Sequence, residues 1–93
     1  MKHIGRPKKI RKTQESPTII RFSPRGRPGR PDEVFLEYDE FEAIRLKDGI
    51  NLSHINSANQ MEISRQTFGR ILHSARRKLA DALVNGKIIR ILG

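Results

Sequence analysis

One uninterrupted amphipathic segment, residues 64–84, limits the folds open to this chain more than any other feature. Its apolar residues recur at i, i+3, i+4, i+7 and i+11, the spacing that places side chains on one face of a helix. Ser64 can cap the start of this helix, and Asn85-Gly86 can end it. The sequence therefore predicts one core-facing stripe over more than four turns: Phe68, Ile71, Leu72, Ala75, Leu79, Ala82 and Leu83.

A shorter helix is predicted over residues 40–48, within a pattern that becomes helical from Glu33 onward. Asp39 is a suitable N-cap, and Glu42 three residues later completes a capping-box pattern. Gly49 can end the helix in a left-handed conformation. Acids at a helix start match the helix dipole, which favours capping and solubility over catalysis. The apolar positions are Phe41, Ala43, Ile44 and Leu46.

A second short helix is predicted over residues 54–61, with Ser53 as its cap and Ile55, Ala58 and Met61 on one apolar face. Glu62-Ile63 then makes a tight break before the long helix. Residues 18–22 and 87–91 are predicted to be short strands. Because isolated strands need partners, these two can pair with each other or across a dimer.

Charged residues and prolines are distributed unevenly along the chain and mark its division into segments. Residues 1–31 hold ten Lys or Arg against one acid, residues 32–63 hold two against eight, and residues 64–93 hold seven against one. All five prolines lie in the first segment. Since proline removes backbone donors and blocks helices, residues 1–31 are predicted to be a basic, extended arm that carries the strand 18–22. Residues 32–93 are predicted to form the folded domain.

Composition excludes several classes of protein. The chain has no cysteine, so a disulfide scaffold, a thiolate zinc site and a cysteine nucleophile are excluded. His3, His54 and His73 lack metal-ligand spacing, and His54 is expected to face solvent. No Gly-rich phosphate loop and no plausible catalytic triad occur. We expect no enzyme activity, no cofactor and no metal.

Partner and location follow from the same composition. The chain contains no apolar run long enough for a membrane helix or a signal peptide, so a cytoplasmic, nucleoid-associated protein is expected. The net charge of +9 favours a polyanionic partner, most often nucleic acid.

The helices at 54–61 and 64–84, joined by a tight turn, match a helix-turn-helix, whose second helix enters the major groove of DNA. Gln66, Arg70, His73 and Arg77 form a polar stripe opposite the apolar one. Arginine can bind guanine and glutamine can bind adenine through paired hydrogen bonds. The exposed helix start, where free N–H groups favour phosphate, adds three further DNA-contact candidates: Ser64, Arg65 and Thr67.

Other basic residues on this helix are assigned differently. Arg76, Arg77 and Lys78 lie too far along it to reach the same bases, so they are assigned to phosphates. An ordinary solvated basic face is the alternative, although residues 64–80 contain no acid.

Gly69 is unusual inside a helix. It allows close approach to DNA or a neighbouring helix, or it meets a packing requirement against the helix at 40–48.

Residues 40–48, Leu52-Ser53 and above all residues 63–87 (ISRQTFGRILHSARRKLADALVNGK) resemble a small prokaryotic family of uncharacterised, predicted DNA-binding proteins. The family's helix-turn-helix is similar to region four of sigma factors, which implies a role like that of a transcriptional regulator. The chain departs from the family at residues 54–57, where acidic and alanine-rich residues are usual. It also departs at Glu62, where glycine is usual and a left-handed residue would be strained.

The arm holds a second DNA-binding candidate. Pro24-Arg-Gly-Arg-Pro28 resembles the core of an AT-hook, Gly29-Arg30-Pro31 continues it, and Gly5-Arg6-Pro7-Lys8-Lys9 is a shorter version. An extended Arg-Gly-Arg-Pro segment is thin enough for the narrow, electronegative minor groove of A·T tracts. A turn-forming linker with non-specific phosphate affinity is the alternative. The arm's candidate contacts are Arg6, Lys8, Lys9, Arg25, Arg27 and Arg30.

These observations predict a mainly α, three-helix helix-turn-helix domain, winged or similar to sigma region four, with a basic N-terminal arm and one or two short strands. We expect it to bind double-stranded DNA as a homodimer and to regulate transcription. One alternative is a module that contacts the transcription machinery through the acidic segment 32–63. Another is RNA binding through the arm, although the few aromatic residues (Phe22, Phe35, Tyr38, Phe41 and Phe68) are mostly core candidates.

Overall fold

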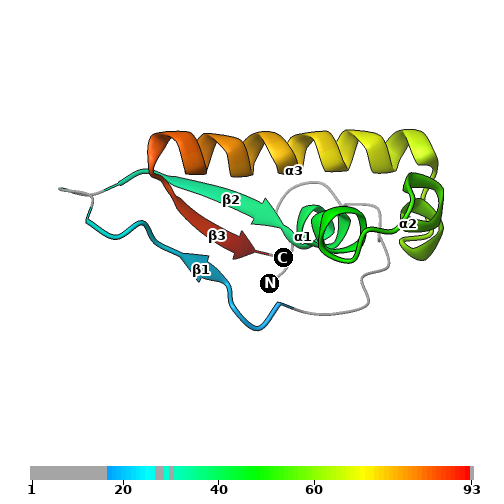
Figure 1. The fold of residues 1–93 in the computed structure, drawn as a ribbon, viewed down its shortest axis with the longest axis horizontal. Helices are drawn as coiled ribbons and strands as arrows, with labels where there is room; N and C mark the ends of the chain where they lie inside the picture. Colours follow the sequence, from blue (N-terminus) through cyan, green and yellow to red (C-terminus); the bar gives the residue numbers. More distant parts are fainter. Residues whose placement is uncertain (1–16, 27–28, 30, 93) are drawn as a thin grey trace, which may run out of the picture.

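The computed structural model describes residues 17–26, 29 and 31–92. A long helix, α3 (Arg65–Asn85), runs along one side, with a small sheet beneath its C-terminal half and two short helices at its N-terminal half (Figure 1). The chain is therefore mainly helical with short strands, as expected. The other elements are β1 (Arg21–Phe22), β2 (Glu33–Glu37), α1 (Tyr38–Ile44), the π-helical turn η1 (Arg45–Gly49), α2 (His54–Gln60) and β3 (Ile88–Leu92). None of the helices within these residues is long and apolar enough to cross a lipid bilayer.

The sheet has the order β1-β3-β2, so the last strand of the chain lies in the middle. β1 pairs antiparallel with β3, with Arg21 opposite Arg90, and the bond from the Ile91 N–H to the Ile20 carbonyl (2.9 Å) extends the pairing. The two strands predicted from the sequence thus pair with each other within one chain. Only Arg21–Phe22 of the predicted strand 18–22 is a strand, and the second is displaced by one residue to Ile88–Leu92.

β2 differs from the prediction that the chain is helical from Glu33 onward. Val34 and Leu36 are buried and Phe35 is 44% exposed, which is the alternation of a strand with one covered face. β2 runs parallel to β3, with Leu36 opposite Ile91. Because this partner lies some fifty residues further along the chain, no local signal marks the segment as a strand.

The start and end of α1 also differ from the prediction. The N-cap is Glu37, not Asp39, and Glu37 and Glu40 form the capping box, in which the Glu37 N–H donates to Glu40 Oε1 (2.9 Å). The helix starts earlier because it follows directly from the end of β2. Its last turn widens into η1, and Gly49 is not left-handed; Asn51, with φ 63°, takes that conformation instead.

The two following helices begin and end close to their predicted residues. Ser53 Oγ accepts a hydrogen bond from the Asn56 N–H (3.0 Å) and caps α2. Ser64 caps α3 through the Thr67 N–H (3.0 Å), and Gly86, with φ 65°, ends it. One side chain on the predicted apolar face of each helix is exposed. Ile55 of α2 is 50% exposed and Leu83 of α3 is 84% exposed.

The turn between α2 and α3 contains two backbone hydrogen bonds typical of the C-terminal end of a helix. The Ile63 N–H donates to the Ala58 carbonyl and the Glu62 N–H to the Asn59 carbonyl, each at 3.1 Å. This geometry requires a left-handed residue, and Glu62 occupies that position with φ 59°. The strain anticipated from the sequence is therefore present, since a side chain at positive φ costs about 1 kcal/mol relative to glycine.

We predict that Glu62→Gly raises the unfolding free energy by about 0.5–1 kcal/mol, because glycine relieves this strain at the cost of a more flexible unfolded chain. Thermal and urea unfolding of the purified protein would measure the change. Glu62→Ala is the matched control, since it removes the same side chain and keeps the strained Cβ. Equal stability of the two variants would contradict the strain argument.

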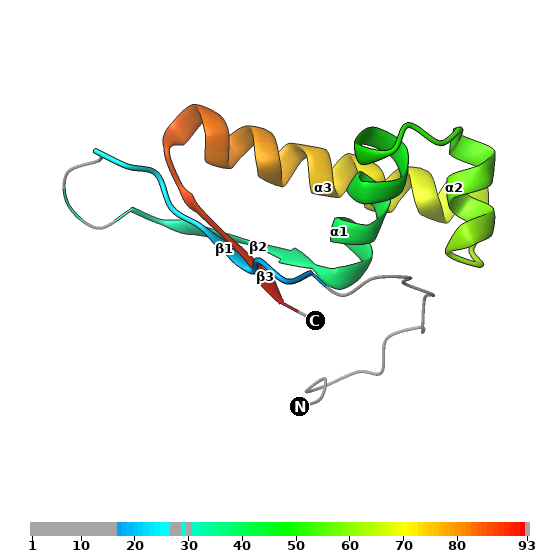
Figure 2. The ribbon, with the colours of Figure 1, turned by 60° about the horizontal axis from the view of Figure 1, so that its bottom comes forward.

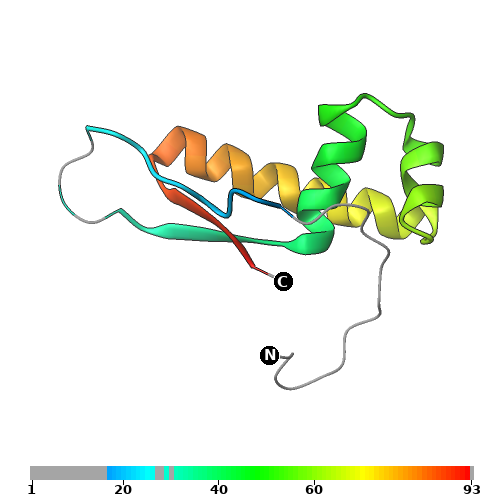
Figure 3. The ribbon, with the colours of Figure 1, turned by 90° about the horizontal axis from the view of Figure 1, so that it is seen from below.

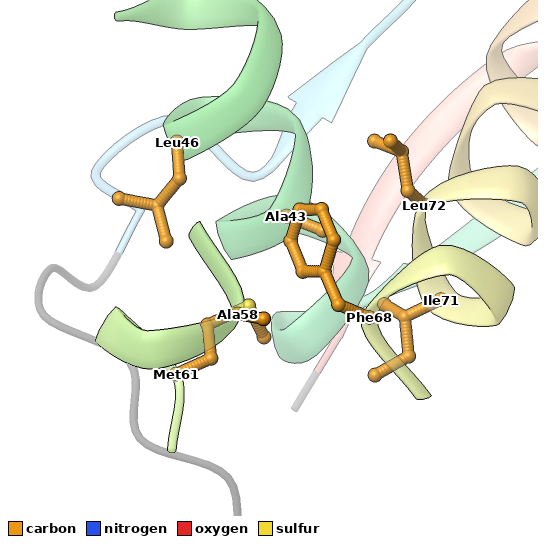
Figure 4. Packing of buried hydrophobic residues seen from close by; sticks show 7 residues of the cluster. All are labelled: Ala43, Leu46, Ala58, Met61, Phe68, Ile71 and Leu72. Carbon is orange, nitrogen blue, oxygen red and sulfur yellow. The ribbon is translucent and has the colours of Figure 1, made fainter. Parts of the chain in front are cut away.

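The core consists of two adjoining clusters along α3. The larger lies where α1, η1 and α2 meet the first half of α3, and Figure 4 shows its side chains converging from all four elements: Ala43, Leu46, Ala58, Met61, Phe68, Ile71 and Leu72. The smaller lies between α3 and the sheet and contains Leu36, Ala75 and Ile91. Contrary to expectation, most aromatic residues are outside both clusters, with Phe22, Phe35 and Tyr38 each 41–51% exposed.

Candidate nucleic-acid interface

A polar stripe follows the face of α3 that points away from both core clusters. Gln66, Arg70, His73 and Arg77 are all exposed, and Phe68, Leu72 and Ala75, on the other side of the helix, are 0–6% exposed. The structure therefore places the four residues on one accessible line, as their spacing predicted. Arg65 is also exposed, at the first turn.

The first turn of α3 is held by a small hydroxyl network. Ser64 Oγ donates to Thr67 Oγ1 (3.0 Å) while it accepts from the Thr67 N–H. Thr67 Oγ1 also accepts from Arg70 Nη2 at 3.5 Å. Ser64 and Thr67, both predicted DNA contacts, thus fix the helix start and help to orient the Arg70 side chain.

The structure divides the basic residues of α3 into two groups. Arg76 binds Asp48 through two hydrogen bonds (2.6 and 3.0 Å), which hold the pKa of the Asp48 carboxyl below its ordinary value. Lys78 Nζ donates to Glu40 Oε1 (2.8 Å) and to the Phe35 carbonyl (2.7 Å). These two residues, which the sequence analysis assigned to phosphates, link α3 to the rest of the domain.

The second group consists of Arg65, Arg70 and Arg77. Among residues 17–26, 29 and 31–92, no carboxylate forms a salt bridge with any of them. None of the three side chains is held by a carboxylate of these residues, although Lys87 and Asn85, helped by the nearby Arg77, hold the pKa of the Asp81 carboxyl below its ordinary value. The acids of the segment 32–63, by contrast, are largely engaged inside the domain, since the fully buried Glu42 binds Arg45 (2.9 Å) and Glu40 and Asp48 bind α3.

His54 corrects the expectation that it faces solvent. Its ring packs edge-on against Phe68, with ring centroids 4.9 Å apart, and Nε2 lies 3.0 Å from the Arg65 carbonyl oxygen. Because a carbonyl can only accept, Nε2 carries the proton and donates. A Cβ added at Gly69 would meet this ring at 3.6 Å, so the neighbour of Gly69 is α2 rather than the α1 helix. His54 and Gly69 together set how closely α2 lies on the first turns of α3.

The second candidate is the motif at residues 24–31, and its described start, Pro24 and Arg25, lies far from the start of α3. Pro24 lines a shallow hollow together with Gly86, the residue that ends α3. Since α3 has 21 residues, its two ends are about 30 Å apart. Figure 3 shows the cyan segment that follows β1 at the end of the molecule where α3 finishes, away from α2. Arg25 is exposed there, whereas Arg6, Lys8, Lys9, Arg27 and Arg30 lie outside the described residues.

Comparison with known proteins places the chain in a family. A family model described as a protein of unknown function, DUF134, matches residues 1–93. The chain belongs to the DUF134 family. It is 48% identical over 90 residues to a UPF0251 protein of Prosthecochloris aestuarii, covering 96% of this chain and 58% of that protein. A UPF0251 protein of Chlorobium chlorochromatii is 50% identical over 93 residues, covering 99% and 52%.

The family contains members of different length. A UPF0251 protein of Thermoanaerobacter sp. is 51% identical over 91 residues, which cover 97% of this chain and 80% of that relative. The chain thus spans little more than half of some curated relatives and most of others. No solved structure is significantly similar to it.

Proposed function

We propose that this protein binds double-stranded DNA in a sequence-dependent way and regulates transcription. The helix-turn-helix would be α2, the turn at residues 61–64 and α3, with the start of α3 in the major groove. Gln66, Arg70 and His73 would face the bases, and Arg65 and Arg77 the phosphates. We further propose that the protein acts as a homodimer in the cytoplasm, at the nucleoid.

The division of the α3 cations is the observation that carries this proposal. Arg76 and Lys78 are held by carboxylates, while Arg65, Arg70 and Arg77 share the accessible stripe without one among the described residues. A face that served only solubility would not need to separate its basic residues in this way. The rigid first turn, fixed by Ser64, Thr67 and His54, supports base reading because side chains must be held in position to discriminate bases.

Selection from a random pool of duplex DNA at near-physiological salt tests the proposal. We expect enrichment of an inverted repeat whose half-sites lie about one helical turn apart, roughly 34 Å. Enrichment of A·T tracts alone would assign binding to the arm. Retention without enrichment, lost at moderate salt, would leave only charge-driven binding.

Variants of α3 separate base reading from phosphate binding. Arg70→Ala and Gln66→Ala are each expected to reduce discrimination between the selected site and single-base variants by about 1–3 kcal/mol. Arg77→Ala should weaken all sequences alike and lower the salt slope of the binding constant by about one. The neighbouring Arg76→Ala is the matched control, because that side chain is already occupied by Asp48. Equal loss of DNA affinity for Arg76→Ala and Arg77→Ala, measured by fluorescence anisotropy, would contradict the assignment.

Single-stranded nucleic acid is a second candidate ligand, favoured by the exposed aromatic residues. Arg21, Arg90 and Phe35 occupy one register row across the three strands, and Phe35 is 44% exposed. Aromatic rings beside arginines on a sheet suit base stacking. Stronger binding of single-stranded RNA or DNA than of the selected duplex, reduced by Phe35→Ala, would favour this candidate over the first. A module that contacts the transcription machinery has weaker support, since the acids expected to form its surface are largely engaged within the domain.

A further inference from the structure

The most exposed large apolar side chains of the described residues lie together at the C-terminal end of α3. Leu83 is 84% exposed and Val84 is 78% exposed. Leu83 borders a shallow hollow whose other walls include Phe22, Pro24, Gly86 and Ile89. Neighbouring apolar side chains exposed to this degree are typical of surfaces that another protein covers.

We propose that two copies of this chain associate through this surface, which we call the α3-end surface: Phe22, Pro24, Leu83 and Ile89. The exposed Val84 lies beside it, on the face of α3 that carries Arg77 and Asp81. A two-fold interface uses the same patch on both copies, so the patch must present both a protrusion and a recess. The α3-end surface has both, because Leu83 projects beside the hollow that its neighbours form. Leu83 of each copy would enter the hollow of the other.

The charges around this surface fit a second copy. Asp81 and Lys87 form an ion pair at its edge (2.8 Å), with side chains 38% and 27% exposed. The two charges balance each other at the rim, so the rim does not repel a second copy of the same chain. A nucleic acid, in contrast, would bring only negative charge to this mixed rim and would leave Leu83 and Val84 without an apolar partner.

The backbone pairing of β1 with β3 is not part of this interface. The strands predicted at 18–22 and 87–91 were expected to pair with each other or across a dimer, and β1 and β3 pair with each other inside one chain. Phe22 and Ile89, which are opposite each other in that pairing, contribute to the hollow. Contact between two copies at this surface would therefore be made by side chains and would leave the β1–β3 pairing within each chain.

The spacing of the two α3 helices in such a dimer also suits DNA binding. This inference about spacing rests on the proposed function. From Gln66 to Leu83, α3 spans about 25 Å, so a two-fold axis near Leu83 allows the two Gln66 residues to lie up to about 50 Å apart. Successive major grooves on one side of DNA are about 34 Å apart, which is within that range when the helices diverge. The α3-end surface also brings Pro24 of both copies, and with it the adjacent exposed Arg25, toward the axis between the two half-sites.

Sedimentation equilibrium of the whole chain without DNA tests the surface. We expect the wild type to reach twice its 10.7 kDa mass as concentration rises. Leu83→Glu should raise the dimer dissociation constant by ~100-fold or more, because each substitution enters the symmetric interface twice. Its fold should be unchanged, since the replaced side chain is exposed, and circular dichroism would verify this. Ile50→Glu, which replaces an apolar residue 54% exposed in the connection between η1 and α2, is the matched control and should dimerise like the wild type.

Two results would overturn the inference. One is a wild type that stays monomeric at every concentration, and the other is a folded Leu83→Glu variant that dimerises as tightly as the wild type. Because no DNA is present, either result is independent of the proposed function. In a separate binding assay, Leu83→Glu should bind a single half-site like the wild type and lose cooperative binding to the inverted repeat. A dimer that binds no duplex would contradict the proposed function and leave the α3-end surface intact.

Discussion

Replacing Phe68 by alanine is expected to lower the unfolding free energy by about 3–5 kcal/mol, the usual range for a buried phenylalanine. Phe68 is 0% exposed and lies in the cluster that joins α1, η1, α2 and α3 (Figure 4). Its ring also packs edge-on against His54. Small domains have total stabilities of about 5–15 kcal/mol, so this loss would leave little margin.

Urea unfolding followed by far-UV circular dichroism would measure the loss. Phe35→Ala is the matched control, because the same ring is removed from a site that is 44% exposed, and a loss below about 1 kcal/mol is expected. Losses of equal size for the two variants would contradict the position of Phe68 in the core. DNA affinity of Phe68→Ala should fall with the folded fraction, without a change in which sequence is preferred.

The helices with local signals could be predicted from the sequence. α2 and α3 begin after Ser53 and Ser64, whose hydroxyls cap the helices, and α3 ends at a glycine with positive φ. Each of these signals lies within a few residues of the helix end it determines. The 3.6-residue period of α3 likewise predicted which of its faces is buried and which carries Gln66 and Arg70.

Features that depend on distant residues were missed. β2 is a strand because β3 lies beside it, and the early start of α1 follows from β2. Leu83 continues the apolar period of α3, yet it is exposed, because the sheet covers the helix only on the side of Ala75 and Ala82. Figure 2 shows the sheet beneath one side of this half of α3. Periodicity gives the direction of a side chain but not whether another element reaches it.

The same limit applies to the candidate interface. Arg76 and Arg77 are adjacent and chemically identical, and only the fold pairs the first with Asp48, 28 residues earlier. Nor does the sequence show that Pro24, in the arm motif, lies at the opposite end of α3 from the predicted DNA contacts Ser64 and Arg65. The distance between the two candidate DNA contacts depends on the sheet pairing, which holds Phe22 of β1 at the hollow beside the end of α3.

The role of Glu40 in the structure differs most from the role predicted from the sequence. Replacing Glu40 is expected to cause the second large loss of stability. From the sequence, the acids near the start of α1 are expected to cap the helix. In the structure, Glu40 is 6% exposed and accepts from Lys78 Nζ (2.8 Å), Ser74 Oγ (2.6 Å) and the Glu37 N–H. It therefore joins the end of β2 and the start of α1 to the middle of α3.

Glu40→Ala is expected to lower the unfolding free energy by about 2–4 kcal/mol, because three hydrogen bonds to a charged, buried acceptor are lost. The lower part of the range for a broken buried pair applies, since Lys78 is 34% exposed and can regain water. Glu33→Ala is the matched control: its pair with Arg90 is longer (3.7 Å) and more exposed, and a loss below about 1 kcal/mol is expected.

DNA binding by the same variant separates a structural role of Glu40 from an electrostatic one. Removing the carboxylate leaves the Lys78 ammonium with the Phe35 carbonyl as its remaining partner. Lys78 directly follows Arg77 and lies one turn after Ser74 on α3. Non-specific duplex affinity of the folded variant should therefore rise at low salt, with a salt slope steeper by about one phosphate contact. Stability and affinity would then change in opposite directions. A folded Glu40→Ala protein with unchanged affinity and salt slope would show that Lys78 cannot reach DNA, and that Glu40 acts on stability alone.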